Sequence, residues 1–353
     1  MHAPRLRARS AFTLIELLLV VAIIALLISI LLPSLAGARK AARTGLCMSN
    51  MRQYAVGIVA YGSDSKGFVP SFSWLPSKQY SAFNDLNNAP TYPDAGADQA
   101  VDIVRRVRGV TAAEVPQARG RMYNRNFTHL VLIDGGYYSD RALEPGVVCP
   151  EDRGPLLWQR EPHNMAAFRA QGLAPADPNG PLLNMLPYWS SYQIVPCTWT
   201  WDKGTGTKRT IDQYSDNHHL YTVPPTNQIA PFTARRMDEI SLPSLKVAAF
   251  DLFDRHRFKR TLYYAYPQAA QPLVFFDGSV SVRTTRDAEK GFQPNAPTST
   301  AATTHYYDAS YWAGYEPPCL TPGITRETVT AHYRWTRNGL KGFDFRSGGS
   351  NRP

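Results

Sequence analysis

At 353 residues, with 44% hydrophobic and 12% aromatic side chains, the chain has enough apolar surface to build a core, which excludes a disordered protein. Its 28 prolines and 24 glycines, beside 19% charged residues, predict a body rich in turns with few long helices. The net charge of +10 arises from basic residues that flank one apolar run or are scattered among acids, so no nucleic-acid partner is predicted.

The first predicted element is an apolar run from Phe12 to Leu32, FTLIELLLVVAIIALLISILL. As a helix, its 21 residues would extend about 31 Å, which is the thickness of a bilayer's hydrocarbon core. Arg5, Arg7 and Arg9 precede the run, and the positive-inside rule keeps such a flank in the cytoplasm. We therefore predict a single-pass protein of the inner (cytoplasmic) membrane, embedded in lipid, with its C-terminal head in the periplasm.

One carboxylate, Glu16, interrupts the apolar run. A lone charge inside a bilayer costs at least about 2.5 kcal/mol, so it requires a partner. If the chain is cut between Ala11 and Phe12, the new α-amino group of a neighbouring subunit supplies that cation. The sequence thus predicts a processing site at Ala11 and Phe12 and an assembly residue at Glu16.

The segment RSAFTLIELLLVVAIIALL resembles the cleavage and N-methylation signal of type IV prepilins and type II secretion pseudopilins. The family pattern is a short basic leader, a small residue at the cut, then Phe, with Glu as the fifth mature residue. Phe12 and Glu16 match, whereas Ala11 replaces the usual Gly. The resemblance implies a leader over residues 1–11, which prepilin peptidase removes before it methylates Phe12.

The same resemblance implies how the mature chain acts. Residues 12–32 would be the polymerisation helix, through which the chain joins other pilin or pseudopilin subunits on an inner-membrane assembly platform. The product would be a type IV pilus or a type II secretion-like filament. A head of more than 280 residues is large for a major pilin, which favours a minor or specialised subunit.

Two alternatives for the apolar run stay open. A secretory signal peptide has support from Ala36-Gly37-Ala38, which forms an A-x-A cleavage pattern. However, the run is longer than the roughly 7 to 15 residues of a signal-peptide core. A plain single-span anchor also fits the length. Because neither alternative explains Glu16, we favour the prepilin interpretation.

The apolar helix is expected to continue into the head. Pro33 predicts a bend, and residues 33–62 keep a helical period with one face suited to packing on the head. The residues that recur at three- and four-residue steps are Cys47, Met51, Tyr54, Ile58 and Tyr61.

The stretch from Pro33 to Ser71 resembles a pseudopilin-like group abundant in planctomycetes and verrucomicrobia. The shared residues are Cys47, Asn50, Arg52, Gln53, Tyr61, Gly67 and Pro70. A Cys-Pro commonly follows in that group, as it does here at Cys149, so the resemblance implies a Cys47–Cys149 disulfide and leaves Cys197 with Cys319. Four separated cysteines allow three connectivities, and unpaired buried thiols are the alternative.

Residues 63–353 are predicted to form one extracytoplasmic head, which makes the fold class α+β: a long pilin-like helix packed on an antiparallel sheet with loop insertions. Clusters of Pro, Asn and Asp at 84–98 and 174–181 predict loops. Short strands are predicted at 146–150, 245–253 and 273–282, the last with a hairpin turn at Asp277-Gly278. The resembling group often ends in such a hairpin with a His about ten residues before it, whereas His256 lies 21 positions before Asp277.

Catalytic signatures are missing from the sequence: it contains no GxSxG, P-loop, HExxH or helix-leading GxGxxG pattern. We predict a protein that acts by assembly and not as an enzyme, without catalytic residues or a cofactor. The best metal candidates are Asp251, Asp254 and His256, with His218 and His219 as additions. Known pseudopilin heads that bind calcium favour such a site, but the spacing is not an EF-hand loop, so we interpret these residues as solvated turns and predict no metal.

Two further functions remain open for the head. An extracytoplasmic enzyme would need a convergent polar site that the sequence does not reveal. A binding module would need an exposed aromatic face, for which Trp199 and Trp201 are candidates. Packing in a core is the favoured interpretation of the tryptophans.

Overall fold

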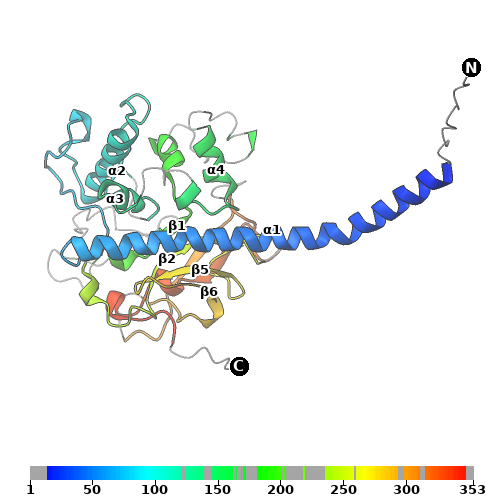
Figure 1. Ribbon diagram of the computed structural model, residues 1–353. Helices are drawn as coiled ribbons and strands as arrows, with labels where there is room; N and C mark the ends of the chain where they lie inside the picture. The colour runs from blue at the N-terminus through cyan, green and yellow to red at the C-terminus, as the bar shows by residue number, and fades with distance from the viewer. Residues whose placement is uncertain are drawn as a thin grey trace, which may run out of the picture. The chain divides into compact units, whose positions relative to one another are not determined.

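The computed structural model describes residues 14–120, 125–138, 145–161, 181–200 and 235–346, except for gaps at 258–259, 293–297 and 311–314, together with the isolated residues 164, 168, 170, 171, 202 and 218. The chain divides into two compact units, Met1–Gly45 and Leu46–Pro353. Figure 1 shows the helices and strands of the described residues.

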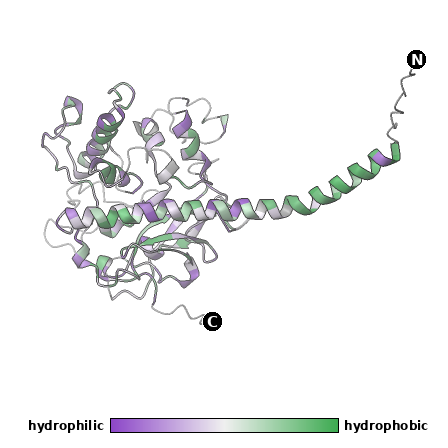
Figure 2. Ribbon diagram, viewed as in Figure 1, coloured by the Kyte–Doolittle hydropathy of each residue, from purple (hydrophilic) through white to green (hydrophobic). Residues whose placement is uncertain are grey.

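The first unit consists of the N-terminal part of helix α1, which spans Leu14–Asp64. Its side chains from 14 to 32 are exposed all around the helix, from 81% at Leu14 to 46% at Val20. Figure 2 shows this stretch as the most hydrophobic part of the ribbon. Among the described residues, α1 is the one helix long and apolar enough to cross a membrane. The backbone is helical on both sides of Pro33, which therefore does not end the helix.

The last part of α1 belongs to the second unit and confirms the predicted amphipathic face. Every third or fourth residue is buried, which is the spacing of one helix face. The buried residues are Cys47, Met51, Tyr54, Ala55 and Ile58. The rings of Tyr54 and Tyr138 meet edge-on with centroids 6.4 Å apart. The helix is therefore part of the head's core, and it ends at Asp64 where the sequence predicts an end near 62.

Within the described residues, four strands form the main antiparallel sheet in the order β1-β2-β5-β6. They span Tyr192–Ile194, Val247–Asp251, Ala270–Phe275 and Val280–Thr284. Phe250 of β2 pairs with Leu273 of β5, and Val274 of β5 pairs with Val280 of β6. The strands predicted at 245–253 and 273–282 and the predicted Asp277-Gly278 hairpin are confirmed, and the fold is α+β with a long helix packed on antiparallel strands.

Two smaller antiparallel sheets pair β3 (Phe253–Asp254) with β4 (Leu262–Tyr263), and β7 (Thr304–Asp308) with β8 (Arg326–Thr330). The further α-helices are α2 (Tyr92–Arg108), α3 (His129–Asp134) and α4 (Arg153–Arg160). Short 3-10 turns connect these elements: Asn84–Leu86, Pro145–Val147, Pro181–Tyr188, Pro196–Thr198, Met237–Glu239, Thr285–Asp287, His332–Arg334 and Gly339–Lys341.

Two sequence predictions for the head are wrong. Residues 92–98 form the start of α2 and not a loop, because the Thr91 side chain accepts a hydrogen bond from the Asp94 N–H and a proline occupies the first helical turn, where it is tolerated. Residues 146–150 form a 3-10 turn and a bend, not a strand, because the Val147 carbonyl accepts from Ser190 and Ser191 instead of a strand ladder. The predicted loop at 174–180 lies outside the described residues.

Candidate functional site

The N-terminal helix carries the first set of functional residues. Glu16 lies in the first turn of α1 and is exposed, as are the apolar side chains around it. Within residues 14–32 it is the one charged side chain of the sequence. A helix that is apolar on all sides must be covered by lipid or by other helices. Ala11 and Phe12 lie outside the described residues.

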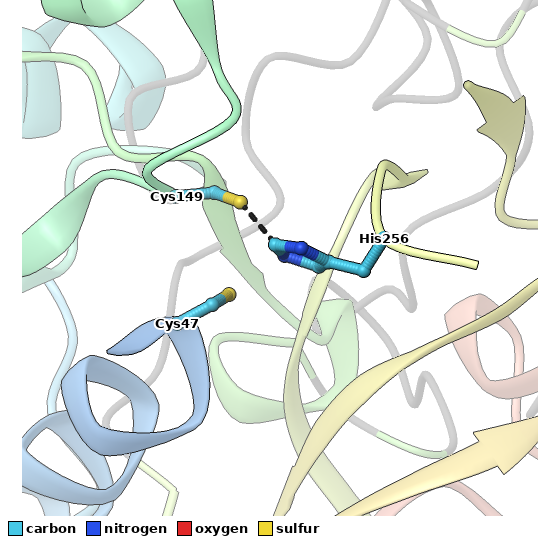
Figure 3. A group of neighbouring side chains, drawn as sticks. All are labelled: Cys47, Cys149 and His256. Atoms are coloured by element: carbon cyan, nitrogen blue, oxygen red, sulfur yellow. Dashed lines mark hydrogen bonds between the residues drawn. The ribbon is translucent and has the colours of Figure 1, made fainter. Parts of the chain in front are cut away.

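The four cysteines lie in the described part of the chain as buried free thiols. Two of them, Cys47 and Cys149, meet in the core together with His256 (Figure 3). The metal-binding atoms of these three side chains all lie within 4.8 Å of one another. Cys149 Sγ is 3.1 Å from His256 Nε2, and Cys47 Sγ is 3.4 Å from the Tyr192 hydroxyl. The implied Cys47–Cys149 disulfide stays a prediction, made between thiols that the fold brings together.

Backbone hydrogen bonds hold Cys149 in place in the bend that follows the Pro145–Val147 turn, here called the Cys149 loop. Its N–H donates to Ser191 Oγ at 3.0 Å, and its carbonyl accepts from the Asp152 N–H at 2.8 Å. The side chain of Asn50, one turn after Cys47 on α1, donates to the Val148 carbonyl at 3.3 Å. These bonds hold the Cys149 loop against α1 and explain why the two sulfurs face each other.

His256 is held by an Asx-type turn after β3. Asp254 Oδ1 accepts from the N–H groups of His256 (3.2 Å) and Arg257 (3.1 Å), while Asp254 Oδ2 accepts from the Ala270 N–H of β5 at 2.9 Å. The carboxylate of Asp254 therefore shapes the turn that points His256 at Cys149. The interpretation of this region as a solvated turn is wrong, because Asp251, Asp254 and His256 are all buried.

The sequence suggested two other histidines, His218 and His219, as metal ligands, and the described one, His218, is not part of this cluster. His218 is buried with its Nε2 at 2.8 Å from Glu316, and its Nδ1 accepts from the Asp308 N–H. His219 lies outside the described residues. Cys197 lies near Lys246 and Asp344, and the Cys319 sulfur lies 4.0 Å from the Tyr307 carbonyl, so each thiol has its own surroundings.

A buried ionic group lies next to the cluster. Arg255 pairs with Asp251 and, at 2.7 Å, with Asp152, which also accepts from Ser191 Oγ at 2.6 Å and Tyr315 at 3.2 Å. With both acids ionised, this group carries one net negative charge. Burial raises the pKa of Asp152, an effect that Arg255 opposes.

Electrostatics within the cluster follow from burial. Burial raises the pKa of the Cys149 thiol well above its usual range, and Cys47 adds to this, while His256 acts in the opposite sense. Burial alone would lower the pKa of His256, but the neighbouring Cys149 outweighs it and the pKa is raised. Burial also raises the pKa of Tyr192, so its hydroxyl stays protonated as a hydrogen-bond donor. Left without a cation, the Cys149 thiol stays protonated at neutral pH.

Four of the described tryptophans, Trp158, Trp189, Trp199 and Trp335, are buried and stabilise the core, as predicted. Trp74 is half-buried, and its ring stacks on that of Tyr80 with centroids 5.1 Å apart. Trp201 lies outside the described residues.

One comparison decides the nature of the N-terminus. Residues 6–32 match the family model of the prokaryotic N-terminal methylation motif. The chain has a prepilin-type N-terminus. The match spans the predicted processing site and Glu16, and it supports a pilin- or pseudopilin-like substrate of prepilin peptidase that assembles with other pilins and is anchored by a single membrane span. Neither a curated protein nor a solved structure matches the chain.

Sequence analysis missed most of the cluster around the cysteines. Cys47 could be placed because it lies in a helical repeat, but His256 was assigned to the neighbouring aspartates. Tyr192 and Arg255 gave no signal. Tyr192 is separated from Cys47 by 145 positions, and Arg255 is separated from its partner Asp152 by 103 positions.

Proposed function

We propose that the chain is a structural subunit, a pseudopilin or minor pilin, of a type IV pilus-like or type II secretion-like filament. One observation carries the proposal: an apolar helix exposed on every side, with a single acid in its first turn, lies inside the segment that matches the methylation motif. Lipid covers such a helix before assembly, and helices of neighbouring subunits cover it afterwards.

The residues take the following roles in this proposal. Prepilin peptidase cuts between Ala11 and Phe12 and methylates the new amine. That amine pairs with Glu16 of a neighbouring subunit, and the pair removes the cost of an isolated charge in a low-dielectric filament core. The basic residues before Ala11 keep the N-terminus in the cytoplasm, so the head lies in the periplasm.

The second unit supports a specialised role for the head. It extends from residue 46 to the C-terminus, which is large for a subunit that repeats along a whole filament. Asn50, shared with the planctomycete and verrucomicrobial group, is buried and fastens α1 to the Cys149 loop. We assign the chain to that group as a minor subunit that acts through assembly, without catalysis, on an inner-membrane platform.

The proposal is tested by intact mass measurement and N-terminal peptide mapping of the protein extracted from membranes of its native host. The expected product begins at N-methylated Phe12. A chain that begins at Arg39 would show signal-peptide cleavage after Ala38, and an uncut Met1 would show a plain anchor. Either result would overturn the proposal.

A further inference from the structure

Three metal-binding side chains converge in the core from segments far apart in the sequence (Figure 3). Cys47 comes from α1, Cys149 from the bend after Pro145–Val147, and His256 from the turn after β3. Because their donor atoms lie no more than 4.8 Å apart, some point lies within about 2.8 Å (4.8 Å divided by √3) of all three. Zinc bonds are about 2.3 Å to sulfur and about 2.0 to 2.1 Å to nitrogen, so only a small contraction is needed.

One distance must lengthen when an ion enters. Two ligands of a tetrahedral zinc ion, one sulfur and one nitrogen, lie about 3.6 Å apart. Cys149 Sγ and His256 Nε2 are 3.1 Å apart as a hydrogen-bonded pair, and the proton they share would be displaced by the ion. Rotation of the two side chains is sufficient for a change of about 0.5 Å.

The charges around the cluster favour a divalent cation. Two thiolates and a neutral imidazole balance the charge of one Zn²⁺, which removes the cost of burying thiolates alone. The neighbouring group of Asp152, Arg255 and Asp251 adds a net negative charge when its acids are ionised. Within the described part of the chain, Asp251 Oδ2 is buried without a hydrogen-bond partner. The surroundings of the cluster thus hold a carboxylate oxygen that no hydrogen bond uses.

We propose that Cys47, Cys149 and His256 bind one zinc ion, which fastens the head-packed part of α1 to the rest of the head. The ligand chemistry selects a thiophilic ion over calcium, since calcium prefers oxygen ligands. The Tyr192 hydroxyl, 3.4 Å from Cys47 Sγ, donates a hydrogen bond to the bound thiolate. This proposal differs from the sequence prediction of a chain without a metal, and the proposed site does not depend on filament assembly.

The direct test is zinc content. The full chain, extracted in detergent and purified without chelator, is expected to hold ~1 zinc ion per chain by elemental mass spectrometry. Cys47→Ser, Cys149→Ser and His256→Gln are each expected to lower this content at least about fivefold, because two remaining ligands bind zinc weakly. Cys197→Ser and Cys319→Ser are the matched controls, since they also remove buried thiols, but elsewhere in the head, and should leave zinc content unchanged.

A second measurement needs no variant and so remains decisive if a ligand variant fails to fold. X-ray absorption of the zinc-loaded, unmodified chain is expected to show two sulfurs at about 2.3 Å and nitrogen or oxygen at about 2.0 to 2.1 Å. A shell without sulfur would overturn the proposal. So would ligand variants that keep parental zinc content.

The disulfide alternative gives a different result in the same preparation. Alkylation of the freshly extracted protein in denaturant, followed by peptide mapping, is expected to label both Cys47 and Cys149. Recovery of these two residues as a disulfide-linked peptide, in protein that takes up no added Zn²⁺, would contradict the zinc site. It would leave the prepilin assignment intact, because that assignment depends on residues of the first unit.

Discussion

His129 at the start of α3 is a fully buried imidazole, and burial lowers its pKa to about 3. In the unfolded chain an ordinary histidine has a pKa near 6.5. Between these values the unfolded state binds a proton that the folded state does not, so the free energy of unfolding falls as the pH falls, by up to ~1.4 kcal/mol per pH unit.

We therefore expect His129→Leu to remove part of the acid sensitivity of the head. Going from pH 7 to pH 5, the variant should lose ~2 kcal/mol less free energy of unfolding than the parent chain. Urea unfolding of both proteins in the same detergent, at several pH values, measures the difference. Parallel pH profiles for the two proteins would show that His129 does not titrate as its burial implies.

The surroundings of a single residue could be predicted from the sequence where its neighbours are close to it along the chain. Glu16 and Cys47 lie in helical stretches, so their neighbours could be inferred from spacing. Asp254 and His256 could not be placed, because burial of a polar turn depends on the segments that cover it. Cys149, which contacts His256, is 107 positions away, and no residue of the turn itself indicates that contact.

At the scale of elements, the β5–β6 hairpin depends on one glycine. Gly278 has a φ of +82°, a conformation that costs residues with a Cβ roughly 1–2 kcal/mol. A Cβ at this position would lie 3.7 Å from Val59 of α1, an ordinary contact, so the expected penalty comes from the backbone and not from a clash.

Gly278→Ala is therefore expected to lower the free energy of unfolding by ~1 kcal/mol. Gly45→Ala serves as control, because Gly45 is helical with open space around its Cβ position, and alanine should leave stability unchanged or raise it slightly. Urea midpoints of the two variants and the parent provide the comparison. Equal destabilisation by both substitutions would refute the conformational explanation.

The predictability of the elements follows from their length and pattern. The long apolar helix and the strands around the Asp-Gly turn were found because each has an unambiguous signal. β1 was missed because Tyr192–Ile194 is three residues long and wholly buried, which leaves no alternation to detect. The start of α2 was missed because its cap and proline lie in a stretch whose composition is typical of loops.

At the scale of the whole molecule, the two units carry separate chemistry. The first contains the residues for membrane anchoring and assembly, and its function follows from a contiguous stretch of sequence. The second unit is stabilised by ion pairs between residues that are distant along the chain, such as Arg255 with Asp152 or Lys246 with Asp344. The role of the head is therefore less visible in the sequence than the role of the anchor.

This separation predicts opposite effects for two substitutions. Glu16→Ala removes the proposed partner of the N-terminal amine, so the amount of chain in sheared, sedimented filaments should fall at least about tenfold. Its zinc content and the thermal midpoint of the head should match the parent. Ser29→Ala is the control within the same helix, because within the described residues the Ser29 hydroxyl donates to the Leu26 carbonyl of its own turn.

Cys47→Ser should show the reverse pattern. Loss of the zinc ion that joins α1 to the head should lower the thermal midpoint by about 5 °C or more. The variant should nevertheless resist extraction from membranes by alkaline carbonate as well as the parent, because the apolar residues 14–32 are unchanged. If Glu16→Ala lost zinc, or if Cys47→Ser left the membrane fraction, the two units could not act independently, and anchoring and head stability would have to be explained by one shared structure.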